Sequence, residues 1–315
     1  MAVVGVDLGS QSTKAVILEG DEILGGASMQ TGESAETEAR MAVQEALKQA
    51  GLKREDLKAA VATGTLAVPV TAALNIAALK TRSPASCIAT GAYFRFPQAR
   101  TVLYVGADSS MAVRMSADGQ VEESVKNERC AVSSGALLDI VSRMLEIPMA
   151  EMGELSLQAT APQTVSSRCV VFAEGEILSF IHKDPPVPVA DVLAGANQCI
   201  ADGLWGMVQK VGVPSELLIC GGVARNAGIV KAIEAARSKL EPARVGFGTT
   251  TLPLNVNRDL FINNKWRQGP NPEGGSDKTV AIVEVLDNST GIPIGVYMNY
   301  AMHPVNFYLR GVISA

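Results

Sequence analysis

A segment near the N-terminus combines glycine with hydroxyl side chains, a composition typical of a phosphate-binding turn. Residues 7–14 read DLGSQSTK and lie between two apolar, β-branched runs. A tight turn of this kind exposes several backbone N–H groups in one concavity, where they bind phosphate oxygens together with Ser and Thr hydroxyls. Asp7 could hold Mg²⁺ through water, because Mg²⁺ keeps most of its hydration shell. The candidate phosphate-binding residues are Gly9, Ser10, Gln11, Ser12, Thr13 and Lys14.

A second glycine-rich turn follows a short buried strand much later in the chain. Residues 219–226 read ICGGVARN, and a helix is expected directly after them. Glycines at such a position let a nucleotide approach the backbone closely. Each turn taken alone could be an ordinary connection between two elements, but the pair favours a nucleotide site. The candidate residues here are Gly221, Gly222, Ala224, Arg225 and Asn226.

Hydrophobic periodicity predicts the elements that position these turns. The first three strands form an antiparallel meander joined by tight turns, and the next segment has helical spacing that stops at Gly51. A strand followed by glycine occurs at 7–9 and again at 105–106, which is a faint internal echo. Strands are expected at 2–7, 14–18, 22–27, 59–62, 101–105, 111–115, 121–125 and 217–220. Helices are expected at 35–50, 134–145, 174–182, 189–211 and from 227.

Composition and charge argue against several classes of protein. A net charge of −5 disfavours a nucleic acid or an anionic membrane bound by bulk electrostatics. No apolar run reaches the roughly 18 to 20 residues that a membrane span needs, and the start of the chain lacks the pattern of a secretory signal. The five cysteines are therefore expected to be thiols or metal ligands rather than disulfides, and the cytoplasm is the expected location.

The first 235 residues resemble the ATPases that activate 2-hydroxyacyl-CoA dehydratases, together with the ATP-binding subunits of benzoyl-CoA reductase. The matching segments are GVDLGSQSTKAVIL, VATG, SCIATGA, NERCAVSSGALLD, SRCVVFAEGEILSFI and GGVARNAG, in the family's order and spacing. The resemblance implies a two-lobed α/β fold of the actin, Hsp70 and sugar-kinase type over residues 1–235. It also implies ATP or ADP and Mg²⁺ as cofactors. The partners it implies are a second copy or a paralogue in a dimer, an electron donor such as ferredoxin, and an acyl-CoA dehydratase or aryl-CoA reductase that receives low-potential electrons under anaerobic conditions.

The same resemblance assigns a metal site to two cysteines. The family holds one [4Fe–4S] cluster between two subunits, and Cys130 and Cys169 match its ligand positions, 169 − 130 = 39 residues apart. Such a cluster takes four thiolates, which a two-fold axis supplies from one pair. Cys130 precedes a predicted helix, whose N-terminus favours a thiolate. The alternative is that both are buried core cysteines, which is the expectation for Cys87, Cys199 and Cys220.

One segment departs from the family's pattern. The family's second phosphate segment reads roughly Asp-Ile-Gly-Gly-Gln-Asp, whereas residues 104–109 read YVGADS. Gly106 is kept and is a candidate nucleotide contact, but Tyr104 and Ser109 replace the two acids. An actin-like site usually needs an acid here for Mg²⁺ or the attacking water. Asp7 and Asp108 are therefore the candidate catalytic residues, and this chain alone is expected to hydrolyse ATP weakly.

The last part of the chain, residues 236–315, has a different character. It contains Gly, Pro and Asn clusters with short β-like runs, the clearest at 278–286 and 293–302. Its segments PARVGFG, NVNRD and YAMHPV resemble the N-terminal catalytic domain of neutral ceramidases, which are zinc amidases. Only His303 matches a zinc-ligand position, and a catalytic zinc needs about three protein ligands. We therefore expect an incomplete ceramidase-like fragment without amidase activity.

Two alternative functions stay open on the sequence alone. One is a small-molecule kinase of the same fold, and the other is a remnant ceramidase-like hydrolase. A kinase needs a catalytic acid near a substrate cleft and has no use for paired cysteines, so bound iron would distinguish it from the electron-transfer ATPase.

Overall fold

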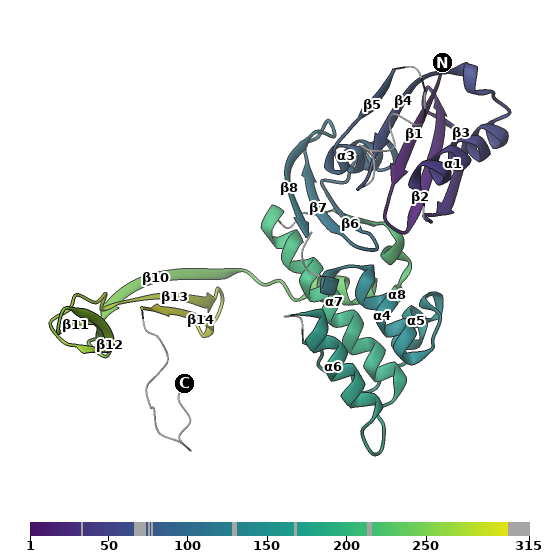
Figure 1. The fold of residues 1–315 in the computed structure, drawn as a ribbon. Helices are drawn as coiled ribbons and strands as arrows, with labels where there is room; N and C mark the ends of the chain where they lie inside the picture. Colours follow the sequence, from purple (N-terminus) through teal and green to yellow (C-terminus); the bar gives the residue numbers. More distant parts are fainter. Residues whose placement is uncertain are drawn as a thin grey trace. The chain divides into compact units, whose positions relative to one another are not determined.

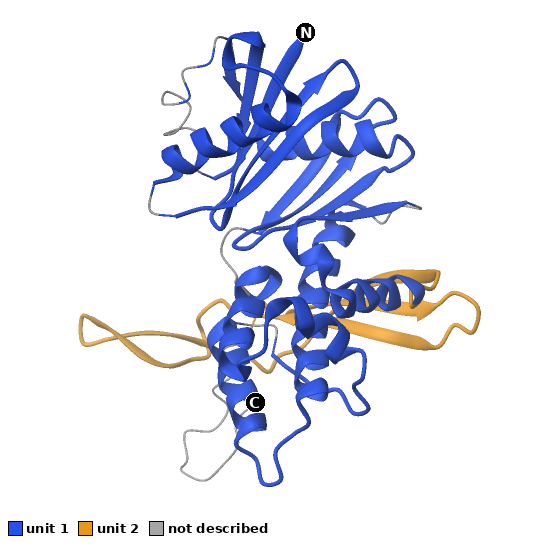
Figure 2. Cartoon of the chain, turned by 90° about the vertical axis from the view of Figure 1, so that its right-hand side faces the viewer, with its two compact units in different colours: residues 1–238 blue, residues 239–315 orange. Residues whose placement is uncertain are grey.

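The computed structural model describes residues 1–32, 34–65, 74, 76, 78–127, 131–166, 169–212 and 216–301. The chain divides into two compact units, Met1–Ser238 and Lys239–Ala315, which are coloured blue and orange in Figure 2. This division lies 238 − 235 = 3 residues beyond the boundary expected from the sequence. No helix in the described part of the chain is both long enough and apolar enough to cross a membrane.

The first sheet of unit 1 has the strand order β3-β2-β1-β4-β5 (Figure 1). β1 pairs antiparallel with β2 and parallel with β4, and α1 packs on β2 and β3. Ser34 caps the N-terminus of α1 by accepting the N–H of Thr37, and Gly51 ends the helix in the left-handed conformation. The elements are β1 (Ala2–Leu8), β2 (Ser12–Glu19), β3 (Glu22–Gln30), α1 (Ala35–Ala50), η1 (Arg54–Asp56), β4 (Leu57–Thr63) and β5 (Leu79–Thr81).

The second sheet of unit 1 repeats the topology of the first, with the order β8-β7-β6-β9. β6 pairs antiparallel with β7 and parallel with β9, just as β1 pairs with β2 and β4. The faint sequence echo thus corresponds to two related lobes. The elements are α3 (Pro84–Arg95), β6 (Thr101–Val105), β7 (Ser110–Met115), β8 (Val121–Asn127) and β9 (Leu217–Cys220).

Both faces of β6 are buried, which explains its nearly continuous apolar sequence. Val102 packs on one face with the alanines of α3, whereas Leu103 and Val105 belong to the larger core beneath α7. Helices α4 to α8 surround that larger core. The helical elements of this part, including two short 3-10 helices, are η2 (Ala131–Ser133), α4 (Gly135–Leu145), α5 (Met149–Ser156), α6 (Val170–Ile181), α7 (Val189–Val211), η3 (Gly222–Arg225) and α8 (Ala227–Ser238).

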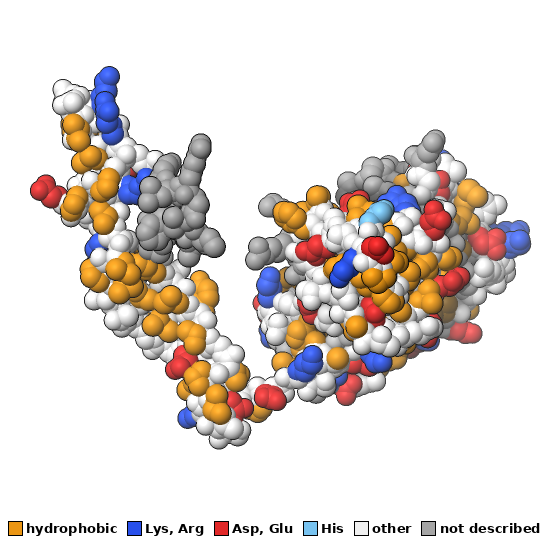
Figure 3. Space-filling model, turned by 90° about the horizontal axis from the view of Figure 1, so that it is seen from below, with side chains coloured by type: hydrophobic (Ala, Val, Ile, Leu, Met, Phe, Trp, Pro, Cys, Tyr) orange, Lys and Arg blue, Asp and Glu red, His pale blue; other side chains and the backbone are white. Residues whose placement is uncertain are grey.

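Unit 2 consists of a three-stranded antiparallel sheet and a separate hairpin, with little buried apolar surface of its own. Among its described residues, Val280 is the one buried hydrophobic side chain, and residues such as Phe247 and Met298 are more than 60% exposed, at 73% and 65%. Figure 3 shows hydrophobic side chains along the visible face of this unit. Backbone pairing therefore contributes more to this sheet than a core does. Its strands are β10 (Ala243–Thr251), β11 (Asn257–Ile262), β12 (Lys265–Asn271), β13 (Thr279–Asp287) and β14 (Pro293–Tyr300).

Candidate functional site

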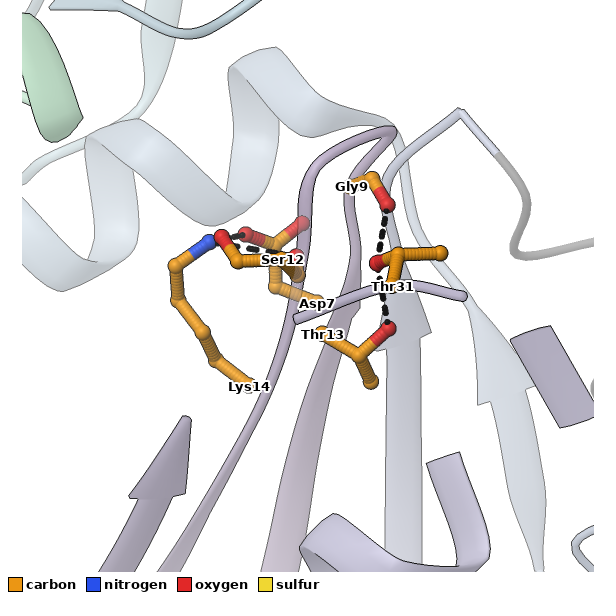
Figure 4. A network of polar contacts seen from close by, with 6 residues as sticks. All are labelled: Asp7, Gly9, Ser12, Thr13, Lys14 and Thr31. Atoms are coloured by element: carbon orange, nitrogen blue, oxygen red, sulfur yellow. Dashed lines mark hydrogen bonds and ion pairs between the residues drawn. The ribbon is translucent and has the colours of Figure 1, made fainter. Parts of the chain in front are cut away.

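The N-terminal turn between β1 and β2 is held by hydrogen bonds on both sides (Figure 4). On one side, the Thr31 hydroxyl donates to the backbone oxygen of Gly9 at 2.9 Å and lies 3.1 Å from the Thr13 hydroxyl. On the other side, Lys14 Nζ lies 3.3 Å from Asp7 Oδ2. A Cβ on Gly9 would lie 2.8 Å from a backbone oxygen within the turn, so only glycine fits there. The turn is thus pre-formed, as an anion-binding turn requires.

A cavity of about 390 Å³ lies between this turn and the turn that follows β9, and we call it the two-turn cavity. It combines two basic side chains with the ends of two turns, while Leu138, Met149 and Val223 add apolar surface. Such a lining suits a ligand with an anionic part and a flat apolar part. The polar side chains in its wall are Gln11, Ser12, Lys14, Tyr104, Arg225 and Asn226.

A neighbouring cavity of about 480 Å³ contains the two candidate catalytic carboxylates, Asp7 and Asp108, and we call it the carboxylate cavity. It shares Lys14 and Tyr104 with the two-turn cavity. Thr63 also lines it, and the buried Oγ1 of Thr63 has no hydrogen-bond partner within the described residues. This hydroxyl can both donate and accept a hydrogen bond. With the two carboxylates nearby, the cavity is suitable for a hydrated cation or a phosphate.

Equivalent glycines in the two lobes press against the strands that lead into the turns. Gly64 follows β4 with φ +100°, and Gly221 follows β9 with φ +99°. A Cβ on Gly64 would lie 2.5 Å from the oxygen of Leu8, and one on Gly221 would lie 2.3 Å from the oxygen of Val105. Both positions therefore require glycine for backbone conformation and packing. This gives Gly221 a structural role that the sequence reasoning did not foresee.

The remaining predicted residues either line one of the cavities or lie away from both. Ser10 and Ser12 line the carboxylate cavity, and Gly106 and Gly222 line the two-turn cavity. The Thr13 side chain is fully buried and bonds Thr31. Gly221, Ala224 and the buried Thr13 are not among the residues that line either cavity.

The cysteines predicted as cluster ligands are described only in part. Cys130 lies outside the described residues, as does His303. Cys169 is half-buried and stands at the N-cap of α6. The described part of the chain contains no group of three or more His, Cys, Asp or Glu side chains that could hold a metal ion. A cluster that draws two cysteines from each of two chains would not form such a group within one chain.

Several lining residues were not predicted. Thr63 and Gly64 follow the strand predicted at 59–62 and were given no role in the site, although the strand-Thr-Gly pattern resembles the strand-Cys-Gly pattern of the second turn. Gly135, at the start of α4, donates its N–H to the oxygen of Gly106 at 2.9 Å. Met149, at the start of α5, carries no sequence signal of its own. These residues reach the cavities only through the tertiary fold.

Two half-buried groups, Tyr104 in the wall of both cavities and Cys220 beside it, have raised pKa values. Burial, with smaller contributions from the charges of Asp7 and Cys220, raises the pKa of Tyr104 from 10.0 to about 12. Burial raises the pKa of the Cys220 thiol from 9.0 to about 11. Tyr104 and Cys220 are direct partners in the parallel register of β6 and β9. Both side chains are therefore neutral at physiological pH.

We expect the free energy of unfolding to decrease as the pH rises from 9 towards 11. The folded protein keeps the Cys220 proton that the unfolded chain releases, so this contribution is complete below pH 9 and is lost through pH 11. A shift of this size corresponds to roughly 3 kcal/mol. Urea denaturation at several pH values measures it. Cys220→Ser should flatten the alkaline decrease, and an unchanged slope in that variant would contradict the assignment.

Two lobes of repeated topology, with a cavity between two glycine-rich turns, define a two-lobed nucleotide-binding protein of the actin-like type. The chain belongs to the BadF/BadG/BcrA/BcrD ATPase family, whose model matches residues 4–242. The predicted fold of unit 1 is thereby confirmed.

Similar proteins support the same class. The activator of lactoyl-CoA dehydratase from Anaerotignum propionicum is 35% identical over 235 residues, which cover 74% of this chain and 87% of the relative. The crystal structure of component A of the Acidaminococcus fermentans (R)-2-hydroxyglutaryl-CoA dehydratase has a TM-score of 0.70 at 29% identity, covering 76% of this chain and 89% of that one. The Clostridium difficile activator of 2-hydroxyisocaproyl-CoA dehydratase, solved with bound ADPNP, has a TM-score of 0.67 at 30% identity, covering 75% and 85%.

The comparisons also concern the two alternatives from the sequence, a small-molecule kinase and a ceramidase-like fragment. The relatives from Anaerotignum propionicum and Clostridium difficile are named as dehydratase activators, so they do not favour the small-molecule kinase. The resemblance of residues 236–315 to a ceramidase fragment finds no support in them and stays a prediction.

Proposed function

We propose that this chain binds ATP or ADP in the two-turn cavity and acts as the nucleotide-dependent activator of an acyl-CoA dehydratase or aryl-CoA reductase. One observation supports the nucleotide site most directly. Two turns that lie near the two ends of unit 1 in sequence line a single cavity, and they bring Lys14 and Arg225 to it. In the proposed pose the phosphates lie at residues 9–14, and the adenosine lies against residues 222–226. Leu138 and Met149 supply apolar contacts for the purine.

The cavity offers room for a ligand beside the second turn. A Cβ on Gly222 would meet no atom within 4 Å, so the space beside this backbone is open. The carboxylates of Asp7 and Asp108 line the adjoining cavity and suit a hydrated Mg²⁺ beside the phosphates. Such a cation would neutralise phosphate charge during hydrolysis, and Lys14 is placed to add a second positive charge.

The partner enzyme is proposed from the relatives. Two of them are named as activators of acyl-CoA dehydratases and one as a dehydratase component, and they align with nearly the whole of unit 1. Titrating ADP and ATP into the Mg²⁺-loaded chain tests the nucleotide half of the proposal, and one nucleotide per chain is expected. No binding at millimolar nucleotide would overturn it. Adding the chain, after chemical reduction, and ATP to an inactive dehydratase component tests the proposed activator role, and dehydratase activity is the expected result.

We also propose that Cys130 and Cys169 of two chains share one [4Fe–4S] cluster in a homodimer or paralogue heterodimer. When bound, such a cluster would carry one electron at a time. Cys169 stands at the N-cap of α6, where the helix dipole favours a thiolate. Beside it, Val171 and Phe172 are 67% and 63% exposed. These apolar side chains next to a candidate ligand support an interface at the N-terminus of α6.

Short contacts connect the two-turn cavity to residues 133–135, which follow Cys130 in the sequence. The oxygen of Gly106, which lines the two-turn cavity, accepts the N–H of Gly135. The Ser110 hydroxyl donates to the oxygen of Ser133. A change in the turn at Gly106 would therefore reach residues that lie within five positions of Cys130 in sequence, 135 − 130 = 5. This supports coupling of nucleotide state to the cluster.

Cys169→Ser is expected to remove most of the bound iron after anaerobic reconstitution with iron and sulfide, because one thiolate ligand per chain is lost. The dimer should weaken, while ADP affinity should stay within about twofold, since Cys169 lies outside both cavities. Iron analysis and size-exclusion chromatography measure the effect. Cys199→Ser is the matched control, because Cys199 also lies outside both cavities, and it should keep its iron. Full iron content in Cys169→Ser would refute the cluster assignment.

A further inference from the structure

A buried chain of hydrogen bonds links helices α5 and α7 to the turn before α8. Asn226 is 7% exposed, and its Nδ2 donates to Asn197 Oδ1 at 3.3 Å. Asn197, on α7 and 2% exposed, donates through its own Nδ2 to Ser156 Oγ at 2.8 Å. The Ser156 hydroxyl donates in turn to the oxygen of Gly153 at 2.6 Å. Asn197 is therefore the central member of this network.

Two glycines bring helices α5 and α8 close against the network. A Cβ on Gly228 would lie 2.1 Å from Ser156 Oγ and 2.4 Å from Asn197 Nδ2. A Cβ on Gly153 would lie 2.8 Å from the backbone nitrogen of Ala227. The two glycines thus let α5 and α8 close on the polar side chains. Such contacts fix side-chain positions tightly, because protein interiors are close-packed.

The same network ends at the two-turn cavity. Asn226 lines this cavity, but its Oδ1 accepts the N–H of Ile229 at 3.1 Å and caps α8, while its Nδ2 is bound to Asn197. The side chain of Asn226 is thus engaged on the protein side. Its main effect on a ligand is to hold the backbone of residues 222–226 in place.

We propose that Asn197 is a positioning residue for the nucleotide, although it does not itself line the two-turn cavity. It fixes Asn226, and through Asn226 it fixes the turn against which the adenosine lies. This inference rests on the proposed nucleotide site. Without Asn197, the buried Nδ2 of Asn226 would lose its partner. Because an unpaired buried donor costs free energy, the side chain of Asn226 would turn towards water or the cavity.

Asn197→Ala is expected to weaken ADP binding about tenfold, because each buried unsatisfied donor costs on the order of one tenfold step in an equilibrium. Asp191→Ala is the matched control. Asp191 lies on the same helix, is 3% exposed, and accepts the N–H groups of Thr160 and Ala161 at 2.8 Å. Removing it should lower the melting temperature comparably and leave ADP affinity unchanged, since it does not contact Asn226.

A double-mutant cycle separates positioning from general destabilisation. Asn226→Ala removes the connection, so adding Asn197→Ala to it should cause no further loss of ADP affinity. Ser156→Ala, a milder change in the same network, should weaken ADP binding in the same direction and by less, and it serves if Asn197→Ala does not fold.

The outcomes are distinct. Weaker ADP binding by Asn197→Ala with unchanged affinity in Asp191→Ala supports the inference. Wild-type affinity in Asn197→Ala and Ser156→Ala, or equal losses in Asp191→Ala, overturns it while leaving the nucleotide site intact. If the wild-type chain binds no ADP, the proposed function fails, and the inference fails with it.

Discussion

Gly222→Asp is expected to reduce ADP and ATP affinity at least about a hundredfold, since the new side chain would fill space that the adenosine occupies in the proposed pose and would bury an unpaired carboxylate there, at a cost of several kcal/mol. Gly222 begins η3 and lines the two-turn cavity, and a Cβ there would meet no atom within 4 Å. Its φ does not lie in the left-handed region. The substitution should therefore fill the cavity without distorting the fold, and calorimetric titration measures the loss.

The control for this variant is Gly91→Asp. Gly91 is exposed on α3, and a Cβ there also meets no atom within 4 Å, but it lines neither cavity. Both variants should melt close to the wild type. Unchanged ADP affinity in a folded Gly222→Asp would place the nucleotide elsewhere.

Tyr104→Asp is expected to raise the rate of ATP hydrolysis about a hundredfold or more, the range over which a positioned acid or base acts. Tyr104 lines both cavities, and its neutral phenol occupies a place beside Asp7. With a pKa of about 12 it cannot accept a proton from water at neutral pH or hold Mg²⁺ by charge. A carboxylate at the same place could do both, and wild-type turnover is therefore expected to be weak.

Tyr104→Phe is the control for this prediction, because it removes the hydroxyl without adding a charge. Its single-turnover rate should match that of the wild type. A wild-type rate comparable to ordinary ATPases, lost in Asp7→Ala and kept in Asp108→Ala, would mean that the missing acids matter less than we infer.

The elements with strong periodic patterns could be predicted from the sequence. The helices Ala35–Ala50 and Val189–Val211 and the strand Leu217–Cys220 have the bounds expected for them. Helix α3 gave no signal, because its buried residues are Ala89 and Ala92 rather than large apolar side chains. Helix α6 begins at Val170 instead of residue 174, since its first residues are β-branched and aromatic and read equally well as a strand.

The candidate site could be predicted only in part. The two turns were recognisable because glycine and hydroxyl residues occur where strands end. The role of Gly221 could not be read, because it depends on contact with Val105, a residue more than 100 positions away, 221 − 105 = 116. The same holds for Asn197, because its partner Asn226 is 226 − 197 = 29 positions away and several other polar residues occur on the same helix.

In unit 2, the predicted strands at 278–286 and 293–302 correspond to β13 and β14, with residues from 302 onward outside the described range. Strands β10 to β12 lie where short β-like runs were expected, but no bounds were predicted for them. Their side chains are mostly exposed, so no alternation of buried and exposed positions guided the prediction.

The location of bound nucleotide tests the central claim most directly. Crystals of the chain grown with ADP and Mg²⁺ should show one nucleotide in the two-turn cavity, with its phosphates at residues 9–14 and its adenosine against residues 222–226. Nucleotide density at any other place, or an empty cavity at millimolar ADP, would contradict the account.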